Sequence, residues 1–133
     1  MIVADTSAII AIVFAEPERE AFIDAIKRAP RVLVSTVSVV EARMAVHGRR
    51  GERAVVLVDV SFSCTGPIVG TLLVDDLLRL PMFELIPPGI AEMDAAYAAF
   101  VAFGKGSGHP AALNFGDVFG YALAKVRGLP LLY

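Results

Sequence analysis

Short runs of apolar, largely β-branched residues alternate along this chain with longer segments in which apolar residues recur at helical spacing. The short runs have the length and composition of strands that are buried on both faces of a parallel sheet. We expect four such strands, at Ile2–Ala4, Val32–Ser35, Phe83–Ile86 and in the C-terminal LPLLY, residues 129–133. Strands that alternate with helices predict an α/β fold with a central parallel sheet flanked by helices.

The longer segments predict the helices. We expect helices over residues 5–18, from Pro17 to residue 29, after Thr36 and Ser38, over Ile90–Phe103 and over Phe115–Arg127, with two more in 54–80 that are broken near CTGP. Thr6 and Ser7 are expected to bond free amides in the first turn of the first helix. Pro30 and Gly128 are expected to end the helices that precede them, since proline cannot continue a helix and glycine favours a left-handed cap.

Composition changes this picture little. The chain has 133 residues, which is most simply one domain able to bury a core. It is 56% hydrophobic with a mean hydropathy of +0.68, so a membrane span has to be weighed. The two most apolar windows are 2–15, which is too short to span and contains Asp5, and 54–74, which contains charge, glycine and proline. We therefore favour a buried core or a subunit interface, and expect a homodimer.

Cysteine content and net charge bear on the cellular compartment and on how the chain could bind nucleic acid. Cys64 is the only cysteine, which excludes an internal disulfide framework and a cysteine zinc site and favours a reducing cytoplasm. The formal net charge is -2, so binding to nucleic acid has to rest on a local basic patch rather than on the charge of the whole chain.

Three acids stand where the apolar pattern predicts another kind of residue. Asp5 follows the first strand directly, and Asp117 lies in the first turn of the last helix. Glu41 lies on the helix after the second strand, on the face that it shares with Val37 and Met44. Because ligands collect at the carboxyl ends of parallel strands, we expect these three carboxylates to converge at one edge of the sheet.

Converging carboxylates repel one another unless a cation neutralises them. A hard divalent ion such as Mg²⁺, which prefers oxygen ligands, suits this set. The paired acids Asp75 and Asp76 are instead expected on a solvated helix face, beside leucines of the same helix.

Each acid also has a plain structural interpretation. Asp5 fits as a helix cap, and Asp117 fits as a first-turn acid favoured by the helix dipole. Glu41 fits as an ion-pair partner of Arg43 or Arg127, or as a solvent-exposed acid. The joint placement of all three at one edge is what favours a single site.

Three blocks of sequence resemble the PIN-domain ribonucleases, specifically the VapC toxins of bacterial toxin–antitoxin modules. They are VADTSAIIAI at 3–12, STVSVVEA at 35–42 and GKGSGHPAALNFGDVFGYALAKVRGLPLLY at 104–133. The last block is the most specific. The resemblance implies a three-layer α/β/α PIN-like domain that binds Mg²⁺ or Mn²⁺ and hydrolyses RNA, either transfer or ribosomal.

By motif, the resemblance makes Asp5, Glu41 and Asp117 the catalytic and metal-binding acids. It implies a cognate VapB-like antitoxin that blocks the acidic pocket through an inserted arginine.

The same motifs imply a supporting polar shell for the acids. By resemblance, Thr6, Ser7 and Asn114 match the polar residues that orient the acids or their water.

The family usually has a fourth acid shortly after the PLL strand, and this chain stops at Tyr133 before reaching it. We therefore expect residues 1–133 to form a single PIN domain that lacks the family's C-terminal strand and tail. This departure supports an alternative, a catalytically impaired PIN-like module that only pairs with an antitoxin. A phosphate-binding regulator is a weaker alternative, because paired early acids and a late lysine are not found. The apolar stretch 55–81 has no assigned role.

Basic residues are needed to meet the RNA backbone. The candidates are Arg49, Arg50 and Arg53 near one turn, with Lys105 and His109 on the glycine-rich loop. For the arginines, a solvated surface cluster is an equally good interpretation. We interpret His109 as an RNA contact or a loop residue rather than a catalytic base, because hydrolysis by a metal-activated water does not require one.

Overall fold

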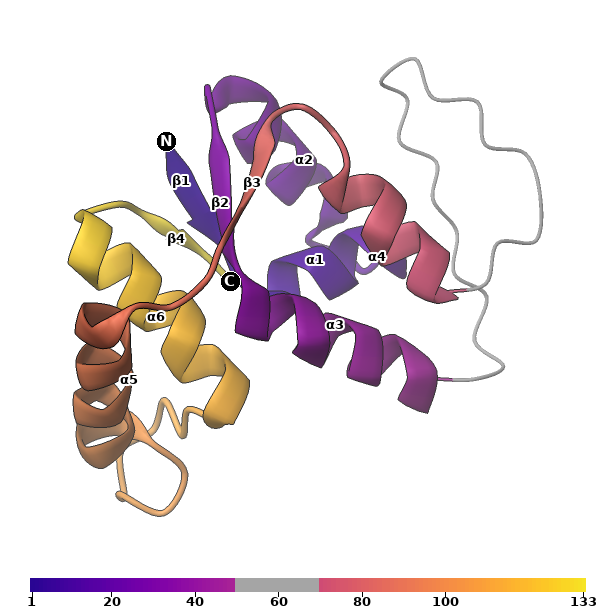
Figure 1. The fold of residues 1–133 in the computed structure, drawn as a ribbon. Coiled ribbons are helices and arrows are strands. Elements are labelled where there is room, and N and C mark those ends of the chain that lie inside the picture. Colours follow the sequence, from indigo (N-terminus) through magenta and orange to yellow (C-terminus); the bar gives the residue numbers. More distant parts are fainter. Residues whose placement is uncertain (50–69) are drawn as a thin grey trace.

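A parallel sheet lies at the centre of the protein (Figure 1). The computed structural model describes residues 1–49 and 70–133. Within them the strands are β1 (Ile2–Ala4), β2 (Val32–Ser35), β3 (Phe83–Ile86) and β4 (Leu131–Leu132). Their order in the sheet is β3-β2-β1-β4, and all three neighbouring pairs are parallel. The four strands and the parallel sheet predicted from the apolar runs are confirmed.

The strands are apolar on both faces because helices cover both faces. On one face, Val3 and Leu33 pack against Leu123 of the last helix. On the other face, Val32 and Val34 belong to the larger core cluster, which the first four helices complete. Alternate residues of β2 therefore enter two different cores, which explains why β1 and β2 carry no polar side chain before their carboxyl ends, whereas the edge strand β3 carries Glu84, paired with Arg31.

The described helices follow the predicted order. They are α1 (Thr6–Val13), α2 (Arg19–Arg28), α3 (Thr36–Gly48), α4 (Gly70–Leu78), α5 (Ile90–Phe103) and α6 (Phe115–Arg127). In Figure 1, α1, α2 and α4 lie on one side of the sheet, while α6 lies on the other with α5 packed against it. Helix α3 continues from β2 and packs against α1, α4 and α6, so it closes the carboxyl edge of the sheet. The result is the three-layer α/β/α arrangement.

Helix boundaries follow the expected punctuation where glycine or proline marks them. α6 ends at Gly128, which has the left-handed φ of 62° that glycine adopts at little cost. Two predicted helix bounds are wrong, the end of the first helix and the start of the third. α1 ends at Val13 instead of running to residue 18, and α3 begins at Thr36, capped by the hydroxyl of Ser35, so Ser38 lies inside that helix. Of the two helices predicted in 54–80, α4 is described and the other lies outside the described residues.

No helix in the described part of the chain has the length and apolar character needed to cross a membrane.

Candidate active site

Asp5 is a buried carboxylate at the carboxyl end of β1. Only 3% of the residue is exposed, and its backbone occupies the N-cap position of α1. Its side chain makes no capping hydrogen bond; instead Oδ1 accepts a hydrogen bond from the hydroxyl of Ser38, at 3.2 Å, across from α3. Asp5 therefore occupies the predicted cap position, but its carboxylate does not cap the helix. The carboxylate faces the gap between α1 and α3.

Burial raises the pKa of Asp5 from 3.8 to about 7, because removing a carboxylate from water disfavours its charged form. Hydrogen bonds from the Thr6 amide and the Ser38 hydroxyl oppose this rise in pKa. The negative charges of Asp117 and Glu41 add to it, because a second carboxylate nearby disfavours ionisation. The three acids singled out in the sequence are thus electrostatic neighbours.

Glu41 reaches the same place from α3, one turn after Ser38. The carboxylate is half-buried, and its Oε2 accepts a hydrogen bond of 2.7 Å from the hydroxyl of Thr6. That hydroxyl also lies 3.2 Å from the carbonyl oxygen of Ser38. Thr6 therefore bonds α3 rather than its own helix, which corrects its predicted role as a cap. Ser7, the other predicted cap, is exposed.

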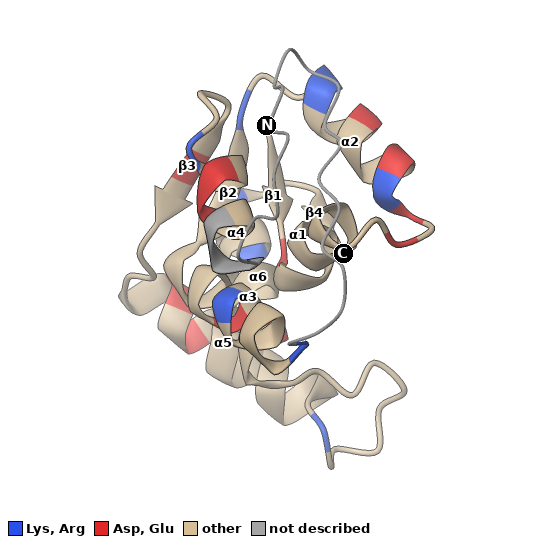
Figure 2. Ribbon diagram, turned by 90° about the vertical axis from the view of Figure 1, so that its right-hand side faces the viewer, with Lys and Arg blue, Asp and Glu red and all other residues tan. Residues whose placement is uncertain are grey.

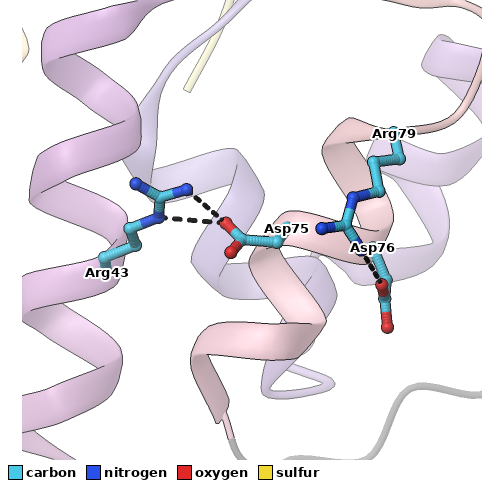
Figure 3. Close-up of polar contacts among 4 residues, drawn as sticks. All are labelled: Arg43, Asp75, Asp76 and Arg79. Carbon is cyan, nitrogen blue, oxygen red and sulfur yellow. Dashed lines mark hydrogen bonds and ion pairs between the residues drawn. The ribbon is translucent and has the colours of Figure 1, made fainter.

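The two arginines offered as partners for Glu41 bind other acids. Figure 3 shows that Arg43 contacts Asp75 of α4, with its Nε and Nη2 donating to Oδ1 at 2.9 and 2.7 Å. Arg127 Nε lies 3.7 Å from the Glu92 carboxylate. The ion-pair interpretation of Glu41 is therefore wrong.

Figure 3 also corrects the interpretation of the paired acids on α4 as a solvated face. Asp75 joins α4 to α3 through Arg43, and its side chain is only 26% exposed. Asp76 forms an ion pair with Arg79 at 3.1 Å and is more exposed. Only Asp76 is therefore largely solvated.

Asp117 is held in a reciprocal cap at the start of α6. The Asn114 backbone amide donates to Asp117 Oδ2 at 2.7 Å, and the Asp117 amide donates to Asn114 Oδ1 at 2.9 Å. This is the capping box that orients an acid in the first turn of a helix. The interpretation as a first-turn acid is correct, and the charge of the same carboxylate also acts on Asp5. Asn114 thus fixes the position of Asp117.

Two glycines on α6 make room for the acids. A Cβ atom at Gly120 would collide with the carboxylate of Asp5, and one at Gly116 would collide with that of Glu41. Sequence reasoning missed both glycines and Ser38. The spacing of four residues, which puts Gly116 and Gly120 on one helical face, is the signal that could have found the glycines. The spacing of three between Ser38 and Glu41 is the signal for the serine.

The three acids provide the right kind of ligand for a hard cation but do not form a ready cage. Their donors are carboxylate oxygens, and a cation would relieve the repulsion at Asp5. In the described residues, however, no group of three or more His, Cys, Asp or Glu side chains is placed to hold a metal ion. Glu41 Oε2 accepts the hydrogen bond from Thr6, and Asp117 Oδ2 accepts one from the Asn114 amide.

Three of the predicted RNA contacts, Arg49, Lys105 and His109, lie in the described part of the chain. Arg49 donates to Glu16 at 2.8 Å and its guanidinium lies 4.7 Å above the ring of Phe14, so it fastens the end of α3 to the core. Arg50 and Arg53 lie outside the described residues.

Lys105 and His109 are exposed on the loop before α6. There His109 packs edge-on against Phe103, with the ring centres 4.9 Å apart. In Figure 2, basic and acidic segments alternate on α2, and no broad basic face covers the described residues on this side. The RNA contacts of all these residues stay predictions.

The sequence was then compared with known proteins. It matches the PIN domain family over residues 2–133. It is 36% identical over 131 residues to VapC ribonuclease Mb0625 of Mycobacterium bovis and to Ribonuclease VapC28 of Mycobacterium tuberculosis, covering 98% of this chain and 86% of each relative. Ribonuclease VapC of Mycolicibacterium smegmatis is also 36% identical, over 98% of this chain and 88% of its own.

A solved structure has the same fold. It is that of Mycobacterium tuberculosis VapC20, described as a Sarcin-Ricin loop cleaving toxin. The TM-score is 0.65 at 14% sequence identity, and the match covers 97% of this chain and 85% of that one.

Proposed function

Because the chain belongs to the PIN domain family and, within it, to the VapC ribonuclease toxins, we propose that it is a metal-dependent endoribonuclease whose site is formed by Asp5, Glu41 and Asp117. The observation that carries the proposal is the convergence of the three acids: α6 passes so close to Asp5 and Glu41 that Gly120 and Gly116 leave no room for a Cβ atom there, and Asp117 lies in the first turn of the same helix. Burial, together with the charges of Asp117 and Glu41, raises the pKa of Asp5. Such a cluster is costly to fold unless something positive occupies it, and perturbed carboxylates of this kind gather at functional sites.

In the proposed site, the acids hold the cation and two hydroxyl groups orient the acids. Asp5, Glu41 and Asp117 would hold Mg²⁺ or Mn²⁺ through carboxylate oxygens. Thr6 and Ser38 orient two of these carboxylates by hydrogen bonds. When bound, the cation would lower the pKa of a water molecule and stabilise the negative charge that develops on the phosphate oxygens.

One of the three carboxylates would also take the proton of the attacking water as a general base. Burial raises the pKa of Asp5 in the metal-free protein, and a bound cation would lower it, because a neighbouring positive charge favours the ionised form. The proton would return to the leaving oxygen, directly or through solvent, as the phosphodiester bond breaks.

The substrate we propose is cytoplasmic RNA, either transfer or ribosomal. One structural neighbour is described as cleaving the sarcin–ricin loop. Its TM-score supports a shared fold, but at 14% sequence identity it does not indicate a shared RNA target. Mapping the new RNA ends in total RNA after induction of the protein identifies the target.

A VapB-like antitoxin is the partner we propose. An inserted arginine would meet three carboxylates, and a guanidinium binds a carboxylate through two hydrogen bonds at once. We also propose a homodimer, supported by the 56% hydrophobic content of this small chain. Light scattering of the isolated protein and titration with the antitoxin test the two assemblies.

Divalent-dependent RNA cleavage by the wild type and by Asp117→Asn tests the activity. We expect cleavage by the wild type in Mg²⁺ or Mn²⁺, none in EDTA, and a loss of at least about 100-fold in the variant, since mutation of a metal ligand disables the site. Equal cleavage by both proteins would overturn the mechanism. Absence of cleavage by the wild type would support the binding-only alternative, which relatives named as ribonucleases do not favour.

A further inference from the structure

An apolar pocket opens directly beside the candidate active site. It lies between α3 and the start of α6, with a volume of about 630 Å³. Val40 and Met44 of α3 and Phe115 of α6 supply apolar wall, and all three side chains are exposed. Glu41 and Gly116, which belong to the candidate site, line the same pocket. The pocket therefore adjoins the candidate site through Glu41.

Phe115 is the main feature of this pocket. It is the first residue of α6, between the capping residue Asn114 and Gly116, and 72% of it is exposed. Its ring packs edge-on against Phe119 one turn later, with centres 5.3 Å apart at an interplanar angle of 64°. This contact covers at most one face of the Phe115 ring, so another flat group can stack on the other face. Burying a large ring that is otherwise left in water also favours an occupant.

The residues that line the pocket favour a neutral, flat ligand. The Glu41 carboxylate repels a phosphate or an acidic side chain, whereas a neutral flat ring meets no such penalty. At the rim, Asn114 uses its side-chain oxygen in the cap, so its amide group can still donate to the polar edge of a base. The volume lies within the range of sites for small organic groups. A nucleobase has this combination of flatness, neutrality and polar edge.

We propose that Phe115 and the apolar side chains of α3 hold one unpaired nucleobase of the RNA substrate next to the acidic site. The proposal rests on the proposed ribonuclease function and deepens it, because a base can enter the pocket only when it is not paired in a helix. Phe115 is thus a substrate-positioning residue, and it selects single-stranded or looped RNA at that nucleotide. Because every base can stack on an aromatic ring, we expect this contact to distinguish unpaired from paired nucleotides rather than one base from another.

Binding of RNA, measured separately from cleavage, tests the proposal. The probe is a fluorescein-labelled single-stranded RNA of defined sequence, titrated in EDTA and again in Ca²⁺ with the full chain. The variants are Phe115→Ala and Phe115→Trp, and the matched control is Tyr97→Ala on α5, an aromatic residue with the same 72% exposure. Circular dichroism verifies that each variant is folded.

We expect Phe115→Ala to weaken RNA binding by about 5- to 100-fold, since stacking on one aromatic residue is of that strength. We expect Phe115→Trp and Tyr97→Ala to bind within about 2-fold of the wild type, because the first keeps a stacking ring and the second lies elsewhere. A set of RNAs in which one abasic nucleotide is moved along the strand adds a second readout. At one position the abasic RNA should bind the wild type more weakly and be insensitive to Phe115→Ala.

Unchanged RNA affinity in Phe115→Ala would overturn the proposal, and so would undetectable RNA binding by the wild type. If the unchanged affinity were accompanied by loss of antitoxin binding or of self-association, the pocket would be a protein-docking site instead. Failure of the proposed ribonuclease function would give a different result. RNA binding would still depend on Phe115, but no divalent ion would support cleavage.

Discussion

Thr6 Oγ1 donates a hydrogen bond of 2.7 Å to Glu41 Oε2 and so joins the first residue of α1 to the middle of α3. The two residues are 35 positions apart in the chain. Because Glu41 is a candidate metal ligand, this hydroxyl decides where one of the three carboxylates stands. The bond is partly buried, and hydrogen bonds to charged groups are among the stronger ones.

Thr6→Val tests the role of this bond, since valine keeps the shape of the side chain and removes the hydroxyl. We expect the free energy of unfolding to fall by about 1–2 kcal/mol, as for loss of a hydrogen bond to a charged group. We expect RNA cleavage to fall by about 10-fold or more, because the carboxylate is no longer oriented. Tyr97→Ala, at an exposed position on α5, is the control and should match the wild type. Cleavage that is unaffected in Thr6→Val would show that Glu41 does not depend on it.

The raised pKa of Asp5 predicts how stability depends on pH in the absence of divalent ions. Below pH 3.8 the carboxyl group is protonated in both folded and unfolded chains, so folding loses nothing. As pH rises toward about 7, the unfolded chain ionises while the folded chain keeps its proton, and stability falls. Asp5→Asn removes this group. The variant should therefore equal the wild type near pH 4 and be more stable near pH 8, by up to about 4 kcal/mol.

Thermal unfolding in EDTA across this pH range measures the effect. The difference between variant and wild type should grow between about pH 4 and pH 7 and stay constant above that. Adding Mg²⁺ at the higher pH should stabilise the wild type and narrow the difference, because a cation that binds the folded state favours it. Parallel stability curves for the two proteins would mean that Asp5 has an ordinary pKa.

Gly120→Ala tests how closely α6 approaches the acids. The added methyl group would collide with the Asp5 carboxylate, so either the helix or the carboxylate has to move. We expect a loss of about 1–3 kcal/mol in stability, typical of overpacking, together with weaker cleavage. Gly48→Ala is a matched control, because a methyl group at that helical glycine meets nothing within 4 Å. That control should be neutral or slightly stabilising, since alanine favours helix. Equal stability of the two variants would contradict the close approach.

Arg43→Ala separates the α3–α4 contact from the site. Arg43 pairs with Asp75, and its side chain is half exposed, so we expect a loss of no more than about 1 kcal/mol and no change in cleavage. Asp75→Asn should behave in the same way. Chemical denaturation and the RNA cleavage assay measure the two quantities. If Arg43→Ala lost most of its cleavage activity while keeping its stability, Arg43 would instead be acting on Glu41 in the active site.

The strands and several helix ends could be read from the sequence because local signals mark them. Apolar runs bounded by proline, glycine or polar residues gave β1, β2 and β3 their bounds, and Gly128 marked the end of α6. Asp5 could be placed at the carboxyl edge of the sheet for the same reason, since it directly follows an apolar run.

The contacts inside the site could not be read in this way. The bonds of Thr6 to Glu41 and of Ser38 to Asp5 depend on how α1 and α3 cross, which local pattern does not determine. The space made by Gly116 and Gly120 depends in turn on how α6 lies against both. Local capping preferences even suggested the wrong role for Thr6, because a tertiary partner was available to its hydroxyl.

Binding of Mn²⁺ to the isolated protein, measured by calorimetry near pH 8, tests the central claim most directly. The wild type should bind the ion, and Asp5→Asn and Asp117→Asn should each bind it at least about 10-fold more weakly, since each removes one carboxylate ligand. Gly48→Ala should bind it as the wild type does. If the wild type takes up no Mn²⁺, or if all four proteins bind it equally, the three carboxylates do not form a metal site.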